Sequence, residues 1–200
     1  MTVDVEIATS KESYPLKVFQ ATLNILSHLL IGIVVGVSLI FALRNGLPLN
    51  ATSQHILLCV VGYQLLMAES ILSLSDDNGW SGVLRFKDKR RAHTIMQAVG
   101  SALVIVGSFI LMLNKNQNFN TLHGQFGKCM FCIKLIKALK IPRTFSSICL
   151  CYGFDYQFFR IWANEAFTNT LIACTACFTT IIIINPSLNF VKKSYHLITN

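Results

Sequence analysis

The sequence has few charged residues, and acidic residues are the scarcest. Only 13% of its 200 residues are charged, with 9 acidic and 17 basic side chains, whereas 53% are hydrophobic. Charged residues make up about a quarter of an ordinary soluble chain, and a chain of this length must expose much of its surface. The composition therefore disfavours a soluble enzyme, a disordered protein and a collagen-like fibre, and it favours an integral membrane protein.

Charge is absent from several long stretches, and these predict where the chain crosses a membrane. No charge lies between Lys17 and Arg44. As a helix this stretch is about 39 Å long, enough to cross a hydrocarbon core of about 30 Å. We therefore expect an all-α membrane bundle with about four spans. They are predicted at residues 19–43, 55–74, 92–114 and 166–191.

The stretch at 128–165 is different because basic residues interrupt it, namely Lys128, Lys134, Lys137, Lys140 and Arg143. Each basic residue at a bilayer centre costs about 2.5–3.5 kcal/mol on insertion scales. A basic amphipathic or interfacial segment is therefore expected here. The chain then divides into an N-terminal tail (1–18), a three-span region (19–127), this basic segment (128–165) and a last span with a short tail (166–200).

The distribution of lysine and arginine predicts the orientation, because cytoplasmic loops carry the excess of both. The N-terminal tail has Lys11 and Lys17, the first loop has Arg44 and the third loop has Lys115. The second loop carries the largest group: Arg85, Lys87, Lys89, Arg90 and Arg91. The N-terminus and the second loop are thus predicted to be cytoplasmic. The positive charge then reports topology beside membrane lipid, and no nucleic-acid partner is expected.

Histidines lie near the predicted membrane edges, where they are functional candidates. His55 and His123 lie at the outer side, and His93 at the inner side. A lone histidine there can equally be an interfacial residue bonded to headgroups or backbone. Neutral imidazole is a common axial ligand of haem iron, and a haem between helices needs two histidines at one depth. His55 and His123 meet that requirement, whereas His93 has no partner at its depth.

Four short motifs resemble the cytochrome b561 family, and most closely its short domain-containing transmembrane reductases. The resemblance covers roughly residues 19–127 and rests on the order, spacing and sidedness of the motifs. His28 also lies where relatives carry a histidine on the first helix. The motifs are Gln54–Leu58 followed by Leu65–Leu72 (second helix), Lys89–His93 with Gln97 (third helix) and Leu122–Gly127 (fourth helix).

The resemblance implies a six-helix membrane protein with two b-type haems, one near each face. Such proteins pass electrons from cytoplasmic ascorbate to monodehydroascorbate or ferric iron. By this resemblance His55 and His123 ligate the outer haem and His93 the inner one. Lys87 and Arg91 lie where relatives place the cations of an ascorbate site, and a cationic rim attracts an ascorbate monoanion. Simple anchoring at the inner membrane surface is an equally good interpretation of these two residues.

The sequence departs from the family pattern after Gly127, where the basic segment replaces an apolar helix. The run Lys192–His196 resembles the start of the family's fifth helix, which makes His196 a further candidate ligand. Either extra residues separate His123 from the helix it should lead, or the sequence after Gly127 is unrelated to the family. The alternative function is accordingly a truncated, non-catalytic relative that binds one haem or none.

Three smaller features leave alternatives open. Glu69, about 21 Å below His55 along a helix, could orient a ligand or handle protons, or be a carboxylate at the headgroup boundary. Gly32 and Gly36 form a G-x-x-x-G that could pack helices within the monomer or in a homodimer. Six of the seven cysteines follow Gly127, and the pair Cys129 and Cys132 with the pair Cys149 and Cys151 superficially suggests a zinc site, but the second pair has the wrong spacing for a zinc ribbon. The six are Cys129, Cys132, Cys149, Cys151, Cys174 and Cys177, and the last two are expected to be packing residues.

Overall fold

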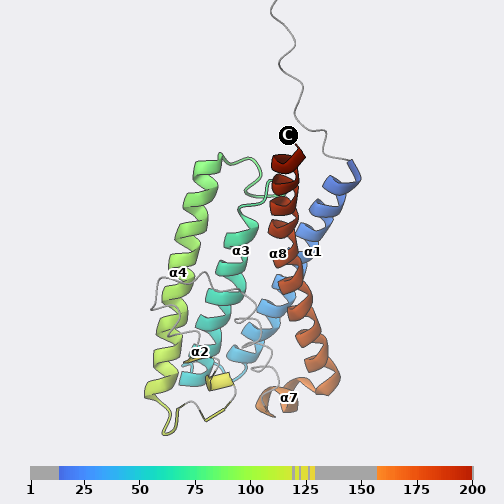
Figure 1. Cartoon of the computed structure of the whole chain (residues 1–200). Helices are drawn as coiled ribbons and strands as arrows, with labels where there is room; N and C mark the ends of the chain where they lie inside the picture. The colour runs from blue at the N-terminus through green and yellow to red at the C-terminus, as the bar shows by residue number, and fades with distance from the viewer. Residues whose placement is uncertain (1–13, 119, 122, 126, 129–156, 200) are drawn as a thin grey trace, which may run out of the picture.

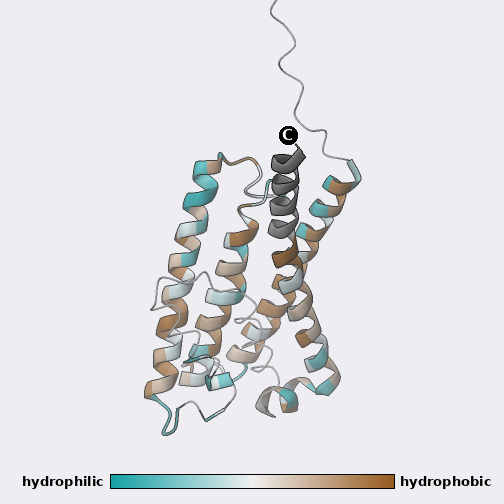
Figure 2. Ribbon diagram, viewed as in Figure 1, coloured by the Kyte–Doolittle hydropathy of each residue, from teal (hydrophilic) through white to brown (hydrophobic). Residues whose placement is uncertain are grey.

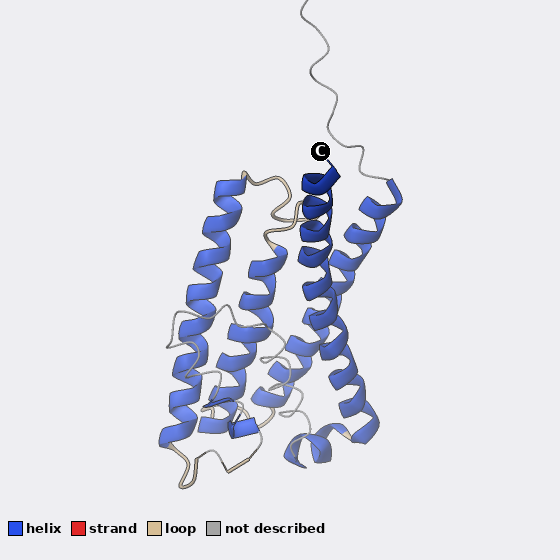
Figure 3. Ribbon diagram, in the orientation of Figure 1, coloured by secondary structure: helices blue, strands red, loops and turns tan. Residues whose placement is uncertain are grey.

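The fold is built from helices. A computed structural model of the chain describes residues 14–118, 120, 121, 123–125, 127, 128 and 157–199, and for 157, 158 and 185–199 it describes the backbone alone. The described residues contain no strand (Figure 3). In chain order the elements are α1 (Tyr14–Leu43), α2 (Ala51–Cys59), the π-helix η1 (Val60–Leu66), α3 (Met67–Leu72), α4 (Phe86–Leu113), α7 (Gln157–Ala163) and α8 (Glu165–Thr199).

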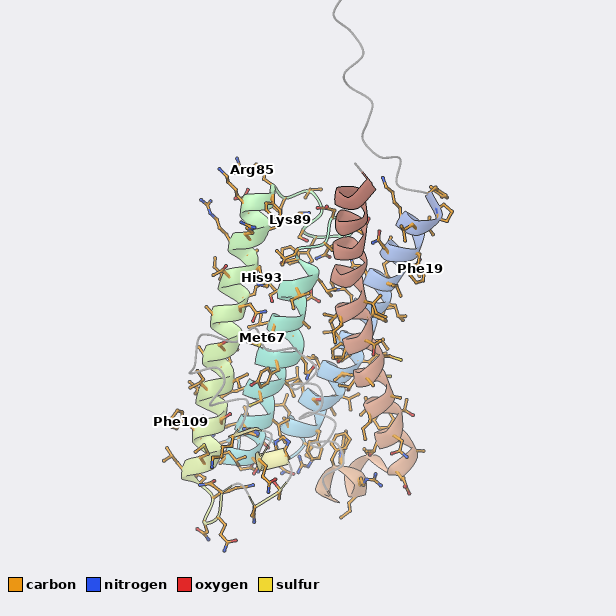
Figure 4. All side chains as sticks on the ribbon, in the orientation of Figure 1. Phe19, Met67, Arg85, Lys89, His93 and Phe109 are labelled. Atoms are coloured by element: carbon orange, nitrogen blue, oxygen red, sulfur yellow. The ribbon has the colours of Figure 1, made fainter. Side chains whose placement is uncertain are left out.

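Four helical stretches are long and apolar enough to cross a membrane, which confirms the expected all-α bundle. Apolar residues dominate their middle sections, and polar residues gather near their ends (Figure 2). Large apolar side chains such as Phe19 and Phe109 are exposed and point away from the bundle (Figure 4), as lipid-facing residues do. The four spans are Tyr14–Leu43, Ala51–Leu72, Phe86–Leu113 and Glu165–Ile184.

The helices form a bundle in which the α2–η1–α3 span has α4 on one side and α1 on the other (Figure 1). Helix α8 packs along α1, and the two share a core that includes Ile31, Val34, Leu171 and Phe178. Helix α1 begins, α3 ends, α4 begins and α8 ends at one end of the bundle (Figure 1). We call this the inner end, after the orientation predicted from the basic residues, and the opposite one the outer end.

Helix boundaries extend beyond each predicted span, and they do so furthest at α4 and α8. Helix α4 begins at Phe86 and so includes four of the five basic residues of the second loop, all but Arg85, because lysine and arginine are good helix formers. Helix α8 continues past Pro186 to Thr199. Proline is tolerated in membrane helices because neighbouring groups can satisfy the freed backbone.

Part of the expected basic segment is helical and belongs to the core. Helix α7 places Phe159, which is buried, with its ring centroid 4.8 Å from that of Phe41 on α1. The ring centroid of Trp162 lies 5.2 Å from that of Phe41. The end of this segment is therefore an aromatic contact with α1. Residues 129–156, with most of the basic positions, lie outside the described part of the chain.

Close helix contact occurs at glycines other than the predicted pair. A Cβ added to Gly62 would lie 2.6 Å from the Gly100 carbonyl oxygen, and one added to Gly107 would lie 2.9 Å from the Leu58 Cβ. The central span and α4 therefore approach closely enough to exclude side chains. A Cβ at Gly32 or Gly36 would meet nothing within 4 Å. Of the two expected uses of the G-x-x-x-G, contact within the monomer is not found among the described residues.

Candidate functional site

At the outer end the structure brings His55 and His123 together. Their ring centroids are 6.0 Å apart and the ring planes are 89° apart. His55 lies in the second turn of α2, which Asn50 caps by accepting a hydrogen bond from the Ser53 amide at 2.8 Å. The His55 Nδ1 lies 3.1 Å from the Gly107 carbonyl oxygen on α4. Because a carbonyl only accepts, Nδ1 carries the proton and Nε2 presents a lone pair.

The donor chemistry of this arrangement fits a metal-bound prosthetic group such as haem, which His55 and His123 would hold. Histidines that bind metal almost always donate their other ring N–H to a carboxylate, a backbone carbonyl or water, as His55 does. With about 2 Å for each metal–nitrogen bond, two imidazoles on opposite sides of one metal ion have ring centres about 6 Å apart. The observed separation has that value. The ring spacing and the hydrogen bond of His55 therefore suit one shared metal ion.

At the inner end His93 is oriented by the same kind of bond. Its Nδ1 lies 2.8 Å from the Ser70 carbonyl oxygen on α3. Ser70 is buried, and its hydroxyl accepts a 2.6 Å hydrogen bond from the Gln97 side-chain amide. His93 therefore also directs Nε2 away from its backbone partner. Among the described residues, no second histidine ring contacts it.

His28 has a different environment, because both of its ring nitrogens face side chains. Nδ1 lies 2.7 Å from the Glu69 carboxylate, and Nε2 lies 3.1 Å from the Asn78 side-chain oxygen. Trp80 Nε1 donates to the other Glu69 oxygen at 3.3 Å. Glu69 thus binds α1 and the loop that follows α3. Neither nitrogen of His28 is presented to a metal.

The predicted cationic residues lie at the start of α4. Lys87 and Arg91 are exposed, and the Arg91 guanidinium is 3.5 Å from the Asp88 carboxylate. They lie four residues apart and share one face of the helix. That face is available to solvent, so it can attract an anion at the inner end.

Lys89 was not predicted as a site residue, yet it shares the helix face of His93 and Gln97. Its side chain is 3% exposed, and its ammonium is 2.6 Å from the Asp76 carboxylate and 3.4 Å from the Ser75 carbonyl oxygen. Lys89 and His93 both point from α4 toward α3, whereas Arg85 extends from the end of the helix (Figure 4). The spacing of four residues was the available signal in the sequence. Lys89 holds the 73–85 loop against α4.

The structure describes only some of the remaining candidates, which are His196 and the cysteines after Gly127. The backbone of His196 lies in the last turns of α8, at the inner end (Figure 1), and its side chain lies outside the described part. The four cysteines between residues 129 and 151 lie outside it as well. Cys174 packs against the core, whereas Cys177 is exposed. Within the described ranges, no cluster of three or more His, Cys, Asp or Glu side chains could hold a metal ion.

Comparison with known proteins identifies the family. A model of the eukaryotic cytochrome b561 family matches residues 54–182. The chain belongs to this family. No curated protein and no solved structure matches it.

The matched range includes His55, His93 and His123, and it ends within α8 before His196. It confirms the predicted family, and it continues past Gly127, where the recognisable motifs end. Family membership and the four apolar helices identify a multi-pass membrane protein and indicate transmembrane electron transport.

Proposed function

We propose that this cytochrome b561 relative carries electrons across the membrane through b-type haem, from ascorbate at the inner end to monodehydroascorbate or ferric iron at the outer end. The observation that supports it best is the His55–His123 pair, with ring centroids 6.0 Å apart and a backbone bond that orients His55. A haem bound there supplies reversible one-electron storage.

At the outer end the protein would fix the position of the haem ligands. The Gly107 carbonyl holds the tautomer of His55, and the absence of a side chain at Gly107 lets α4 lie against α2. Such outer bonds raise the basicity of a ligating imidazole and fix its plane. His55 and His123 would hold the haem between them.

At the inner end His93 would ligate the second haem, with His196 as the candidate partner on α8. The Ser70 carbonyl holds His93, and Gln97 in turn donates to the Ser70 hydroxyl. About 21 Å of helix separates His93 from Gly107, so the two sites would lie near opposite faces. The exposed Lys87 and Arg91 would attract the ascorbate monoanion.

One observation favours a second candidate function. Among the described side chains, two histidine rings meet only at the outer end. A relative with one haem there, and no transfer across the membrane, is consistent with that asymmetry.

Haem content and reduction by ascorbate test both candidates. The full chain is purified in detergent, its haem is quantified, and reduced-minus-oxidised spectra are recorded with ascorbate and with dithionite. Two haems per chain, ascorbate reduction and reoxidation by a ferric chelate or monodehydroascorbate are expected. One haem supports the second candidate, and a chain without haem contradicts the proposed electron transfer.

A further inference from the structure

A polar cluster joins α1, α3 and the 73–85 loop at the inner end. It contains none of the proposed haem ligands. Its centre is the His28–Glu69 pair, whose Nδ1–Oε1 distance is 2.7 Å. Asn24, one turn before His28, donates from its side chain to the Asp77 carbonyl oxygen at 2.9 Å. The loop is thereby bonded to α1 at two successive turns.

The cluster contains buried polar atoms that lack partners in the described part of the chain. They are Asn24 Oδ1, Asn78 Nδ2 and Ser81 Oγ, and all three side chains are at most 2% exposed. Buried polar groups are almost always hydrogen-bonded, and ordered water commonly completes them. Asn78 and Ser81 lie in one turn, next to Asp77. The cluster is therefore suited to hold water beside His28.

Asn78 lets His28 exist in two protonation states with the same neighbours. With its oxygen toward Nε2, as placed, Asn78 accepts a hydrogen bond from Nε2–H, while Nδ1–H donates to Glu69. A ring that donates from both nitrogens is the imidazolium. With the amide turned over, its NH₂ donates to the Nε2 of a neutral ring. An amide oxygen and nitrogen are nearly the same size, so the exchange needs no other movement.

The charges around the pair stabilise the imidazolium that forms when the neutral ring takes up a proton. The Glu69 carboxylate is in direct contact, and its side chain is 17% exposed. The loop and α4 also carry Asp76 and Lys89, which neutralise each other at 2.6 Å, and Asp77, whose backbone carbonyl accepts from Asn24. No described cation of α1 or α3 contacts His28.

We propose that the His28–Glu69 pair accepts the proton released when ascorbate is oxidised at the inner end, which rests on the proposed function. The ascorbate monoanion loses one electron and its hydroxyl proton and becomes the monodehydroascorbate radical anion. The ascorbate O–H bond breaks and an N–H bond forms at His28 Nε2, while haem, where bound, would supply the one-electron acceptor. The Glu69 carboxylate balances the imidazolium, and water in the cluster conducts the proton.

Two amide variants separate proton acceptance from structure. Glu69→Gln and His28→Gln keep hydrogen-bonding side chains of similar size but remove the carboxylate or the imidazole. We expect each to slow reduction of the haem-loaded protein by ascorbate about tenfold or more, as for loss of a general base. Reduction by dithionite, which releases no proton from a bound hydroxyl, stays unchanged. The matched control is Glu165→Gln, an exposed glutamate at the outer end of α8.

A second readout does not depend on haem reduction. Trp80 donates to Glu69, and the chain has only 2 tryptophans, so Trp162→Phe leaves Trp80 as the sole tryptophan, whose emission can be excited selectively. Its emission should change with pH in this background, and the change should disappear in Glu69→Gln and in His28→Gln. A change that persists in both variants overturns the proposal.

The other outcomes also decide. The proton-accepting role is overturned if ascorbate reduces both variants as fast as the wild type. It is also overturned if both variants are slowed equally with ascorbate and with dithionite, or if both lose haem, because the pair would then be structural. If ascorbate does not reduce the wild-type chain, the proposed function fails and this proton source fails with it. If ascorbate reduces the wild type and both variants equally well, the proton site alone is overturned.

Discussion

At both ends of the bundle a histidine is oriented by a bond from its Nδ1 to a backbone carbonyl of the neighbouring helix. At the outer end the bond runs from α2 to α4, where His55 contacts Gly107, and at the inner end from α4 to α3, where His93 contacts Ser70. The two ends differ in the polar groups that accompany this oriented histidine. The outer end adds a second histidine ring, whereas the inner end adds a polar cluster around His28.

This difference separates two uses of one residue type. His55 and His93 keep Nε2 available, because only Nδ1 has a described partner, whereas His28 has polar partners at both nitrogens. The first pattern suits ligation and the second suits proton exchange. The number and depth of the histidines do not distinguish these two uses. The environment of Nε2 does.

The largest expected effect is at the outer pair. His55→Ala removes one ring, so the outer haem signal should disappear from the reduced-minus-oxidised spectrum. His28→Gln, which changes a histidine at the other end, should leave haem content unchanged. An unaltered spectrum in His55→Ala would contradict the assignment of this pair as ligands.

The next effect concerns the glycine contact behind His55. Gly107→Ala places a Cβ 2.9 Å from the Leu58 Cβ and 3.5 Å from the His55 carbonyl oxygen, so α4 must move away from α2. We expect a loss of about 1–3 kcal/mol in unfolding free energy, as for other overpacked sites. Haem retention at the outer end should weaken with it, as measured by thermal melts with absorbance detection.

Gly36→Ala is the matched control, because its Cβ meets nothing within 4 Å. Replacing an unhindered helical glycine by alanine is neutral or stabilises by up to about 1 kcal/mol. Equal effects of the two substitutions would show that the close contact at Gly107 does not position His55.

These contacts mark the limit of sequence reasoning. The spans could be predicted because charge-free runs are a local property of the chain, and the depth match of His55 and His123 follows from them. The π-helix at Val60–Leu66 and the Gly62–Gly100 approach could not, because they depend on how two helices meet. The His28–Glu69 bond joins residues 41 positions apart, and no periodicity in either segment indicates it.

A smaller effect is expected at the base of the loop. Lys89→Met keeps the apolar stem but removes the ammonium that bonds Asp76 and Ser75. Because the Asp76 side chain is almost fully exposed, the cost should be only about 1 kcal/mol of unfolding free energy. Lys87→Met, at an exposed position of the same helix, should not lower the melting temperature. Equal melting temperatures for the two variants would show that Lys89 does not hold the loop.

The smallest effect is expected at the cationic rim, and it concerns substrate capture. Lys87→Gln and Arg91→Gln should each raise the KM for ascorbate severalfold with little change in kcat, because exposed charges attract the anion without touching the reaction. The difference from wild type should shrink at high salt, since exposed charges are screened beyond about 8 Å at physiological ionic strength. Arg44→Gln removes the same charge at the outer end and should leave the KM unchanged. If all three variants behave alike, the inner rim has no specific role, and the basic residues at the start of α4 act only as membrane anchors.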